Sequence, residues 1–182
     1  MNLTLSGNFL KCTYTDDNGR VVYKVHTSST YPGNSTTISK VLPDDIPRGA
    51  SENGKGSGDR FAHLARIDWK VVYSTLVRGG EETSAKTFFR REGISGALGR
   101  NRIFVGDDGR EYRWLLGACT SELELNDEYK TPVAKFDRRN VGSVFGFGKK
   151  RPAVLKNFPA GEHMVDLIML TFLYIEHVRR DD

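Results

Sequence analysis

A long apolar run near the C-terminus constrains the fold of this chain more than any other feature. Residues 164–175 read MVDLIMLTFLYI, and only Asp166 and Thr171 interrupt the run. It is too short to cross a bilayer as a helix, which takes about 20 apolar residues, and too long for a typical strand of about 5–6 residues. We therefore predict a buried helix over residues 162–180. Because the helix is apolar on nearly every side, it needs walls all around it.

Alternating apolar and polar residues, the pattern of half-buried strands, dominate the chain before that run. The clearest stretch is 66–73, where Ile67, Trp69 and Tyr73 share one face. His63 shares a face with Phe61 and is expected to be packed. Asn18-Gly19 and Asp108-Gly109 are strong hairpin-turn signals. Further strands are predicted over residues 21–27, 37–41, 86–91, 102–105, 111–116, 121–125, 132–136 and 153–158.

Many antiparallel strands followed by one hydrophobic helix predict a mainly β fold. A closed antiparallel β-barrel wrapped around a C-terminal central helix satisfies both demands. The 182 residues, of which 38% are hydrophobic and 27% charged, are typical of one globular domain spanning residues 1–182. The segment ASENGKGSG, about residues 50–58, reads as a flexible surface loop within that domain.

The N-terminus has neither a basic leader nor an apolar run of signal-peptide length, which favours a cytoplasmic location. Cys12 and Cys119 are too few for a disulfide framework or a structural zinc site, so we expect two reduced thiols.

A basic and aromatic segment, residues 138–151, is the strongest candidate for binding. It combines five cations and two phenylalanines in a Gly-rich stretch: Arg138, Arg139, Lys149, Lys150, Arg151, Phe145 and Phe147. A peripheral membrane contact needs this combination, because the cations meet lipid phosphates and the rings enter the interface. The alternative is a solvated hairpin whose phenylalanines are in the core.

Other chemistries find less support in the residues. His163 and Asp166 stand at i and i+3, so they could orient a general base, yet no nucleophile can be placed beside them. The acidic turns at residues 16–17 and 107–108 do not match an EF-hand loop, and no metal or cofactor is expected. The basic dipeptides are dispersed and balanced by 23 acidic residues, which disfavours nucleic acid as a partner.

Six segments of the chain carry a resemblance to a known group of proteins. They read TYTDDNGRVVYKV (13–25), DRFAHLARIDW (59–69), FFRREG (88–93), DGREYRWLLG (108–117), KTPVAKFDRR (130–139) and KKRPAVLKNFPAGEHMVDLIMLTFLYIEHVRR (149–180). The chain resembles a family of fungal proteins of unknown function assigned to the tubby C-terminal-like superfamily. That superfamily includes the tubby proteins, the phospholipid scramblases and the plant LURP-one-related proteins. The resemblance implies a β-barrel around a hydrophobic helix, and no catalytic mechanism comes with it.

Tubby domains bind phosphoinositide head groups through basic residues, so the resemblance agrees with the basic segment. We therefore expect a non-enzymatic intracellular binding module for anionic phospholipid or phosphoinositide head groups, cytoplasmic and peripheral at a membrane, without a transmembrane span. The alternative is a protein–protein interaction scaffold of unknown partner. A remote alternative is an enzyme that uses His163 and Asp166.

Overall fold

A single antiparallel sheet of 13 strands dominates the computed structural model, and its strand order is β7-β6-β5-β4-β3-β2-β1-β13-β12-β11-β10-β9-β8. The structure describes residues 1–30, 33–43, 60–70, 72–92, 101–117, 120–138 and 152–181. The segment 50–58 lies outside these residues. The strands are β1 (Asn2–Leu5), β2 (Cys12–Thr15), β3 (Val21–Thr30), β4 (Gly33–Val41), β5 (Phe61–Trp69), β6 (Thr75–Arg78), β7 (Glu81–Ser84), β8 (Arg90–Arg91), β9 (Arg102–Val105), β10 (Glu111–Leu116), β11 (Thr120–Leu125), β12 (Pro132–Asp137) and β13 (Val154–Asn157).

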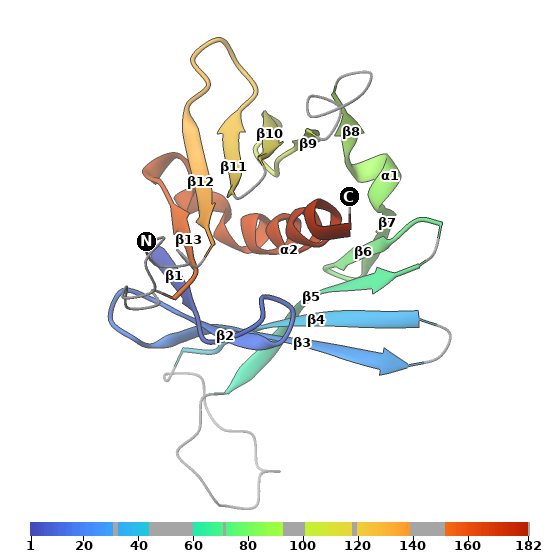
Figure 1. Ribbon diagram of the computed structural model, residues 1–182, viewed down its shortest axis with the longest axis vertical. Helices are drawn as coiled ribbons and strands as arrows, with labels where there is room; N and C mark the ends of the chain where they lie inside the picture. The colour runs from blue at the N-terminus through green and yellow to red at the C-terminus, as the bar shows by residue number, and fades with distance from the viewer. Residues whose placement is uncertain are drawn as a thin grey trace, which may run out of the picture.

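Two meanders make up this sheet. Strands β1 to β7 follow one another in space, as do β8 to β13, and the pairing of β1 with β13 joins the two. Figure 1 shows the sheet curving around the C-terminal helix, with β3 to β5 on one side and β9 to β12 on the other. The predicted mainly β fold with a C-terminal helix is therefore confirmed.

The closed barrel that the sequence predicts is not confirmed. The pairing order ends at β7 and β8, and no ladder joins these two strands among the described residues. The one-turn helix α1 (Ala85–Phe88) lies between them in the chain. We call this interruption, bounded by β7 and β8 and occupied by α1, the seam.

Helix α1 also replaces the strand predicted over residues 86–91, of which only β8 remains. The reason is that Phe88 and Phe89 follow one another, and a strand would send them to opposite faces. The helical turn lets both rings pack against Phe104, at centroid distances of 5.6 and 5.9 Å. Burial of two adjacent aromatic side chains therefore overrides the alternating pattern.

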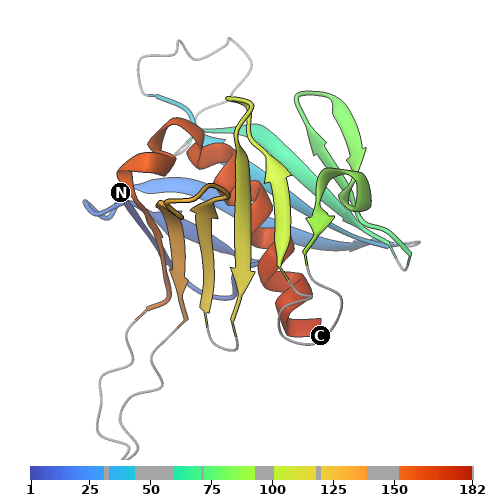
Figure 2. The ribbon, with the colours of Figure 1, turned by 90° about the horizontal axis from the view of Figure 1, so that it is seen from above.

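The sheet curves around the C-terminal helix α2 (Val165–Asp181), and Figure 2 shows this helix running between the two meanders. Every residue from 167 to 173 is at most 2% exposed. Seven consecutive buried positions cover almost two turns, so no flank of this part of the helix faces water. The predicted helix over residues 162–180 is confirmed, except that its first part is the 3₁₀ helix η2 (Pro159–Met164). Among the described residues, no helix has the length and apolar character needed to cross a membrane.

A glycine stands at the entry to this helix because the backbone there lies too close to β12 for a side chain. Gly161 is buried, and a Cβ atom there would lie 2.8 Å from the Val133 carbonyl oxygen of β12.

Both predicted hairpin turns form, with φ of 76° at Gly19 and at Gly109. The turns share one backbone pattern, in which the N–H of Asp16 or Gly106 donates to the carbonyl of Arg20 or Arg110.

Two predictions about β5 are wrong. The strand ends at Trp69 rather than continuing to Tyr73, which is half exposed. His63 is exposed rather than packed. The cause is an irregularity between Ile38 and Ser39 of β4, where the partner of β4 moves from Ala65 directly to His63. A bulge of this kind breaks the alternation of faces, so Ala65 is buried while His63 faces solvent.

Candidate functional site

The segment predicted to bind lipid is described only at its first residue. Arg138 is exposed directly after β12. It lines neither of the two hollows described below. Its predicted companions lie outside the described residues: Arg139, Phe145, Phe147, Lys149, Lys150 and Arg151. A lipid contact by this segment therefore stays a prediction.

Two hollows lie at opposite ends of α2. The N-terminal hollow, of about 610 Å³, includes Met164, Asp166 and Leu167 in its wall. The other hollow, of about 690 Å³, includes Tyr174, His177 and Val178. Because α1 and β8 complete its wall, we call it the seam hollow.

Positive charge is concentrated in the seam hollow. Five cationic side chains are in its wall, and no carboxylate is among the described residues that line it. The cations come from the residue after β5, from α1, and from β8 and β9: Lys70, Lys86, Arg90, Arg91 and Arg102. Such a wall attracts anions, because each cation adds to the same potential.

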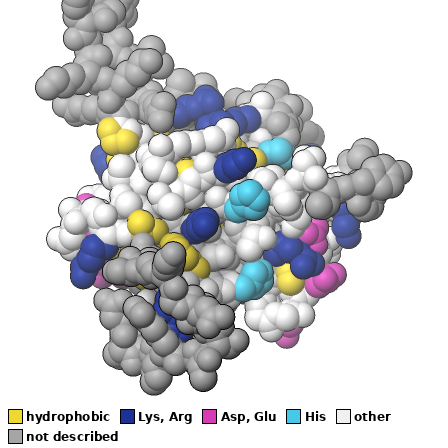
Figure 3. All heavy atoms as spheres, turned by 90° about the horizontal axis from the view of Figure 1, so that it is seen from below, with side chains coloured by type: hydrophobic (Ala, Val, Ile, Leu, Met, Phe, Trp, Pro, Cys, Tyr) yellow, Lys and Arg dark blue, Asp and Glu magenta, His cyan; other side chains and the backbone are white. Residues whose placement is uncertain are grey.

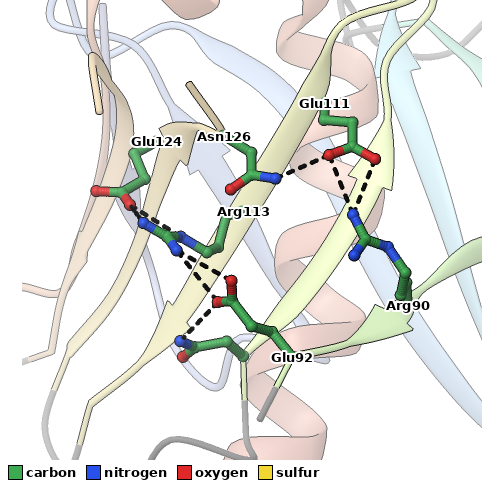
Figure 4. Close-up of polar contacts among 7 residues, drawn as sticks. Arg90, Glu92, Glu111, Arg113, Glu124 and Asn126 are labelled. Atoms are coloured by element: carbon green, nitrogen blue, oxygen red, sulfur yellow. Dashed lines mark hydrogen bonds and ion pairs between the residues drawn. The ribbon is translucent and has the colours of Figure 1, made fainter. Parts of the chain in front are cut away.

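One of these cations, Arg90, forms an ion pair with a carboxylate that does not line the hollow. The guanidinium of Arg90 donates to both carboxylate oxygens of Glu111, at 2.9 and 3.1 Å, as Figure 4 shows. The hydrogen bonds of Asn126 and Arg90 lower the pKa of Glu111. Nearby, the guanidinium of Arg113 donates to Glu92 and Glu124. Hydrogen bonding to Glu124 raises the pKa of Arg113. These acidic residues are thus engaged on the outer side of β8 to β11.

The remaining exposed cations of the seam hollow are not balanced in this way. Lys70 and Arg91 make no ion pair or hydrogen bond through their side chains within the described part of the chain. Lys86 contacts Tyr73, with its Nζ atom 3.4 Å from the hydroxyl and 4.9 Å from the ring centroid, and forms no ion pair with a described residue. Three cationic side chains are therefore available to an external anion.

Aromatic rings form the inner wall of the seam hollow. Tyr174 of α2 stacks between Phe89 and Trp69, at centroid distances of 4.8 and 6.2 Å and interplanar angles of 10° and 5°. Trp69 also contacts the ring of His177, 4.0 Å away, and its indole N–H donates to the Thr36 hydroxyl at 2.7 Å. These contacts hold the rings of the inner wall in place.

The N-terminal hollow differs because its wall includes carboxylates, and two of them, Asp107 and Asp166, are paired with cations of the same wall. The Asp166 carboxylate accepts the Tyr23 hydroxyl at 2.5 Å and Lys40 Nζ at 2.9 Å. Burial, and then the hydrogen bond to Asp166, raise the pKa of Tyr23 well above its usual value. Across the same hollow, Arg78 forms a bidentate pair with Asp107, and hydrogen bonding raises the pKa of the guanidinium.

His163 and Asp166, the pair predicted as a possible acid–base unit, do not meet. His163 Nε2 lies 3.1 Å from the Asp108 carboxylate and 3.3 Å from the Tyr112 hydroxyl. Burial alone would raise the pKa of Asp108, but hydrogen bonds from Tyr112 and Arg110 outweigh it and lower that pKa well below the usual range. Burial and the bond to Asp108 raise the pKa of Tyr112 to about 12. The geometry ties His163 to the β9–β10 turn instead.

No three His, Cys, Asp or Glu side chains of the described ranges come together as metal ligands. Cys12 is a free thiol whose pKa is raised by burial. Cys119 lies outside the described residues.

The outer face of the sheet has dispersed charge. Figure 3 shows Lys, Arg and His side chains scattered over the face below β2 to β5, with acidic side chains at its margins. Lys24, His26 and His63 are exposed there. This face therefore lacks the concentration of cations found in the seam hollow.

The fold and the seam hollow define a mainly β protein that holds its C-terminal helix inside a curved antiparallel sheet. The chain belongs to a family of unknown function (DUF6593), which matches residues 7–181. The match includes every residue that lines the seam hollow. No curated protein and no solved structure gives a significant match.

Proposed function

We propose that the protein is a non-enzymatic binding module for anionic phospholipid head groups, phosphoinositides included, and that the seam hollow receives the phosphates. The observation that carries this proposal is a wall with five cations and no carboxylate among its described residues. Its volume of about 690 Å³ suits a ligand of head-group size, since small-molecule sites span about 300–1,000 Å³.

Electrostatics favours a membrane phosphate as the ligand. Basic residues near an anionic leaflet contribute about 1 kcal/mol each, so Lys70, Lys86 and Arg91 together supply a binding energy of practical size. The net charge of +4 supports the same orientation toward a negative surface. Anionic lipids are concentrated on the cytoplasmic leaflet, so the protein would act as a peripheral protein in the cytoplasm.

The basic and aromatic segment is proposed as a second contact with the same surface. It would add Arg138, Arg139, Lys149, Lys150 and Arg151 as cations, and Phe145 and Phe147 as interfacial rings. We also infer kinship with the tubby-like superfamily and a fungal source. The enclosed C-terminal helix supports the kinship, although a shared fold alone does not fix function.

Co-sedimentation with vesicles tests the proposal. We expect binding to phosphatidylcholine vesicles only when they contain phosphatidylinositol bisphosphate. The variant K86E/R91E should lose that binding, whereas K11E/K24E, with the same change of charge on exposed cations outside the hollow, should keep it. A third variant, K149E/K150E/R151E, measures the contribution of the basic segment.

Two results would count against the proposal. Equal losses in K86E/R91E and K11E/K24E would show that only overall charge matters. The interaction-scaffold alternative would be favoured if the wild-type protein binds neither kind of vesicle and instead retains a stoichiometric protein partner in a pull-down.

A further inference from the structure

Two apolar side chains stand exposed at the edge of the seam hollow. Val72 is 73% exposed and Tyr73 is 49% exposed, and both line the hollow. The described residues expose three other large hydrophobic side chains, Met1, Val105 and Tyr129, and none of these is next to another in sequence. Single exposed apolar residues are ordinary, but an adjacent pair beside a basic hollow is not explained by the core.

The local structure fixes Tyr73 at the edge of the hollow. Strand β5 ends at Trp69, whose ring turns to Tyr174, and the chain then bends before β6 begins at Thr75. The Ser74 carbonyl accepts the N–H of Ala85 at 2.9 Å, which ties the segment to the start of α1. Tyr73 is therefore anchored next to Lys86, with its ring beneath the ammonium group.

We propose that Val72 and Tyr73 form an apolar finger that enters a lipid bilayer while Lys70, Lys86 and Arg91 contact the phosphates around it. This inference rests on the proposed function and specifies how the same site meets its membrane. Tyrosine suits this position, because its ring enters the interface while its hydroxyl stays at the level of the head groups.

The charges around the finger favour a bilayer over a second copy of the chain. A copy would bring the same basic rim and the same net charge of +4, so the two rims would repel each other. An anionic bilayer offers negative charge at its surface and an apolar layer about 5–10 Å below it. The finger and the surrounding cations match these two layers.

The test separates insertion from recognition of the head group. The variant V72S/Y73S removes apolar surface without changing charge, and V105S/Y129S is a matched control with the same two substitutions away from the hollow. Each protein is titrated with phosphatidylcholine vesicles that contain phosphatidylinositol bisphosphate, and separately with soluble inositol trisphosphate.

We expect V72S/Y73S to bind the vesicles about tenfold more weakly, from the apolar area no longer buried. Its affinity for inositol trisphosphate should fall much less, because the substitutions remove only the contact of Tyr73 with Lys86 and leave every cation of the hollow in place. An equal loss of affinity for both ligands would overturn the finger. The control should match wild type with both ligands. If V72S/Y73S binds the vesicles as tightly as wild type does, and wild type binds both ligands, the finger is overturned and the proposed function stands. If wild type binds neither ligand, the proposed function fails and the finger with it. A dimer in solution that V72S/Y73S dissociates would also overturn the inference.

Discussion

The two ends of helix α2 show opposite uses of charge. At the N-terminal end, Asp166 is bound by Lys40 and Tyr23, and Arg78 is paired with Asp107. At the C-terminal end, the seam hollow has cations in its wall and no carboxylate among the described residues that line it. Both hollows have a similar size, so volume alone does not distinguish them.

The difference indicates which charges serve the fold. The pair between Arg78 of β6 and Asp107 of the β9–β10 turn links the two meanders near the seam, where no backbone ladder between described residues joins them. Asp166 likewise ties α2 to β3 and β4. Charges that are neutralised within the protein hold elements together, whereas the side chains of Lys70 and Arg91 have no ion-pair partner in the part of the chain that the structure describes.

The largest effect is expected at Glu176, which is fully buried near the C-terminal end of α2. Its carboxylate accepts hydrogen bonds from Arg179 and Arg180, at 2.7 to 3.0 Å. Glu176→Ala should lower the free energy of unfolding by about 3–5 kcal/mol, because it leaves buried Arg179 without this acceptor. Urea denaturation measures the loss, and Glu176→Gln should cost less. A loss below about 1 kcal/mol would mean that water reaches this end of the helix.

A smaller effect is expected at the N-terminal hollow. Asp166→Asn removes the ion pair to Lys40 and weakens the bond from Tyr23, and Asp166 is partly exposed. We expect a loss of about 1 kcal/mol in the free energy of unfolding and no change in vesicle binding. Thermal unfolding and co-sedimentation of the same preparation check both. Loss of vesicle binding in a folded Asp166→Asn variant would contradict the division of roles between the two ends.

The Asp108 carboxylate should make stability depend on pH. Its pKa in the folded protein is lowered, so its contribution is fully present above the ordinary value of about 3.9 and is lost as pH falls through the folded value. Asp108→Asn should therefore be less stable than wild type at neutral pH by about 1 kcal/mol. The difference should shrink below about pH 4. Melting temperatures of both proteins across this range test it, and a constant difference would refute the assignment.

The enclosed helix could be predicted because its signal is local. The run from Leu167 to Leu173 is apolar at all positions but Thr171, whose hydroxyl donates to the Leu167 carbonyl within the helix. A single polar atom satisfied by its own helix does not change the prediction of burial. Strand β10 follows equally local alternation, and the predicted bounds of β9 and β10 are confirmed.

The seam and its hollow could not be predicted in this way. Whether a sheet closes depends on contacts between distant segments, and here Phe88 and Phe89 turn the chain into α1 before β8. Lys70, Lys86 and Arg91 are spread over two elements and a bend, with no periodicity that links them. The exposure of Tyr73 could not be predicted either, because its alternation with Ile67 and Trp69 is typical of a continuing strand. The exposure of His63 depends on a bulge in pairing, which leaves no mark in composition.

Two matched double variants test the central claim most directly, because each removes two cations from one hollow. K86Q/R91Q alters the seam hollow, and K40Q/R78Q alters the N-terminal hollow. We predict that K86Q/R91Q loses binding to vesicles that contain phosphatidylinositol bisphosphate, with its free energy of unfolding within about 0.5 kcal/mol of wild type. K40Q/R78Q should keep that binding while it loses stability. Equal loss of binding in the two variants, or loss only in K40Q/R78Q, would contradict the account.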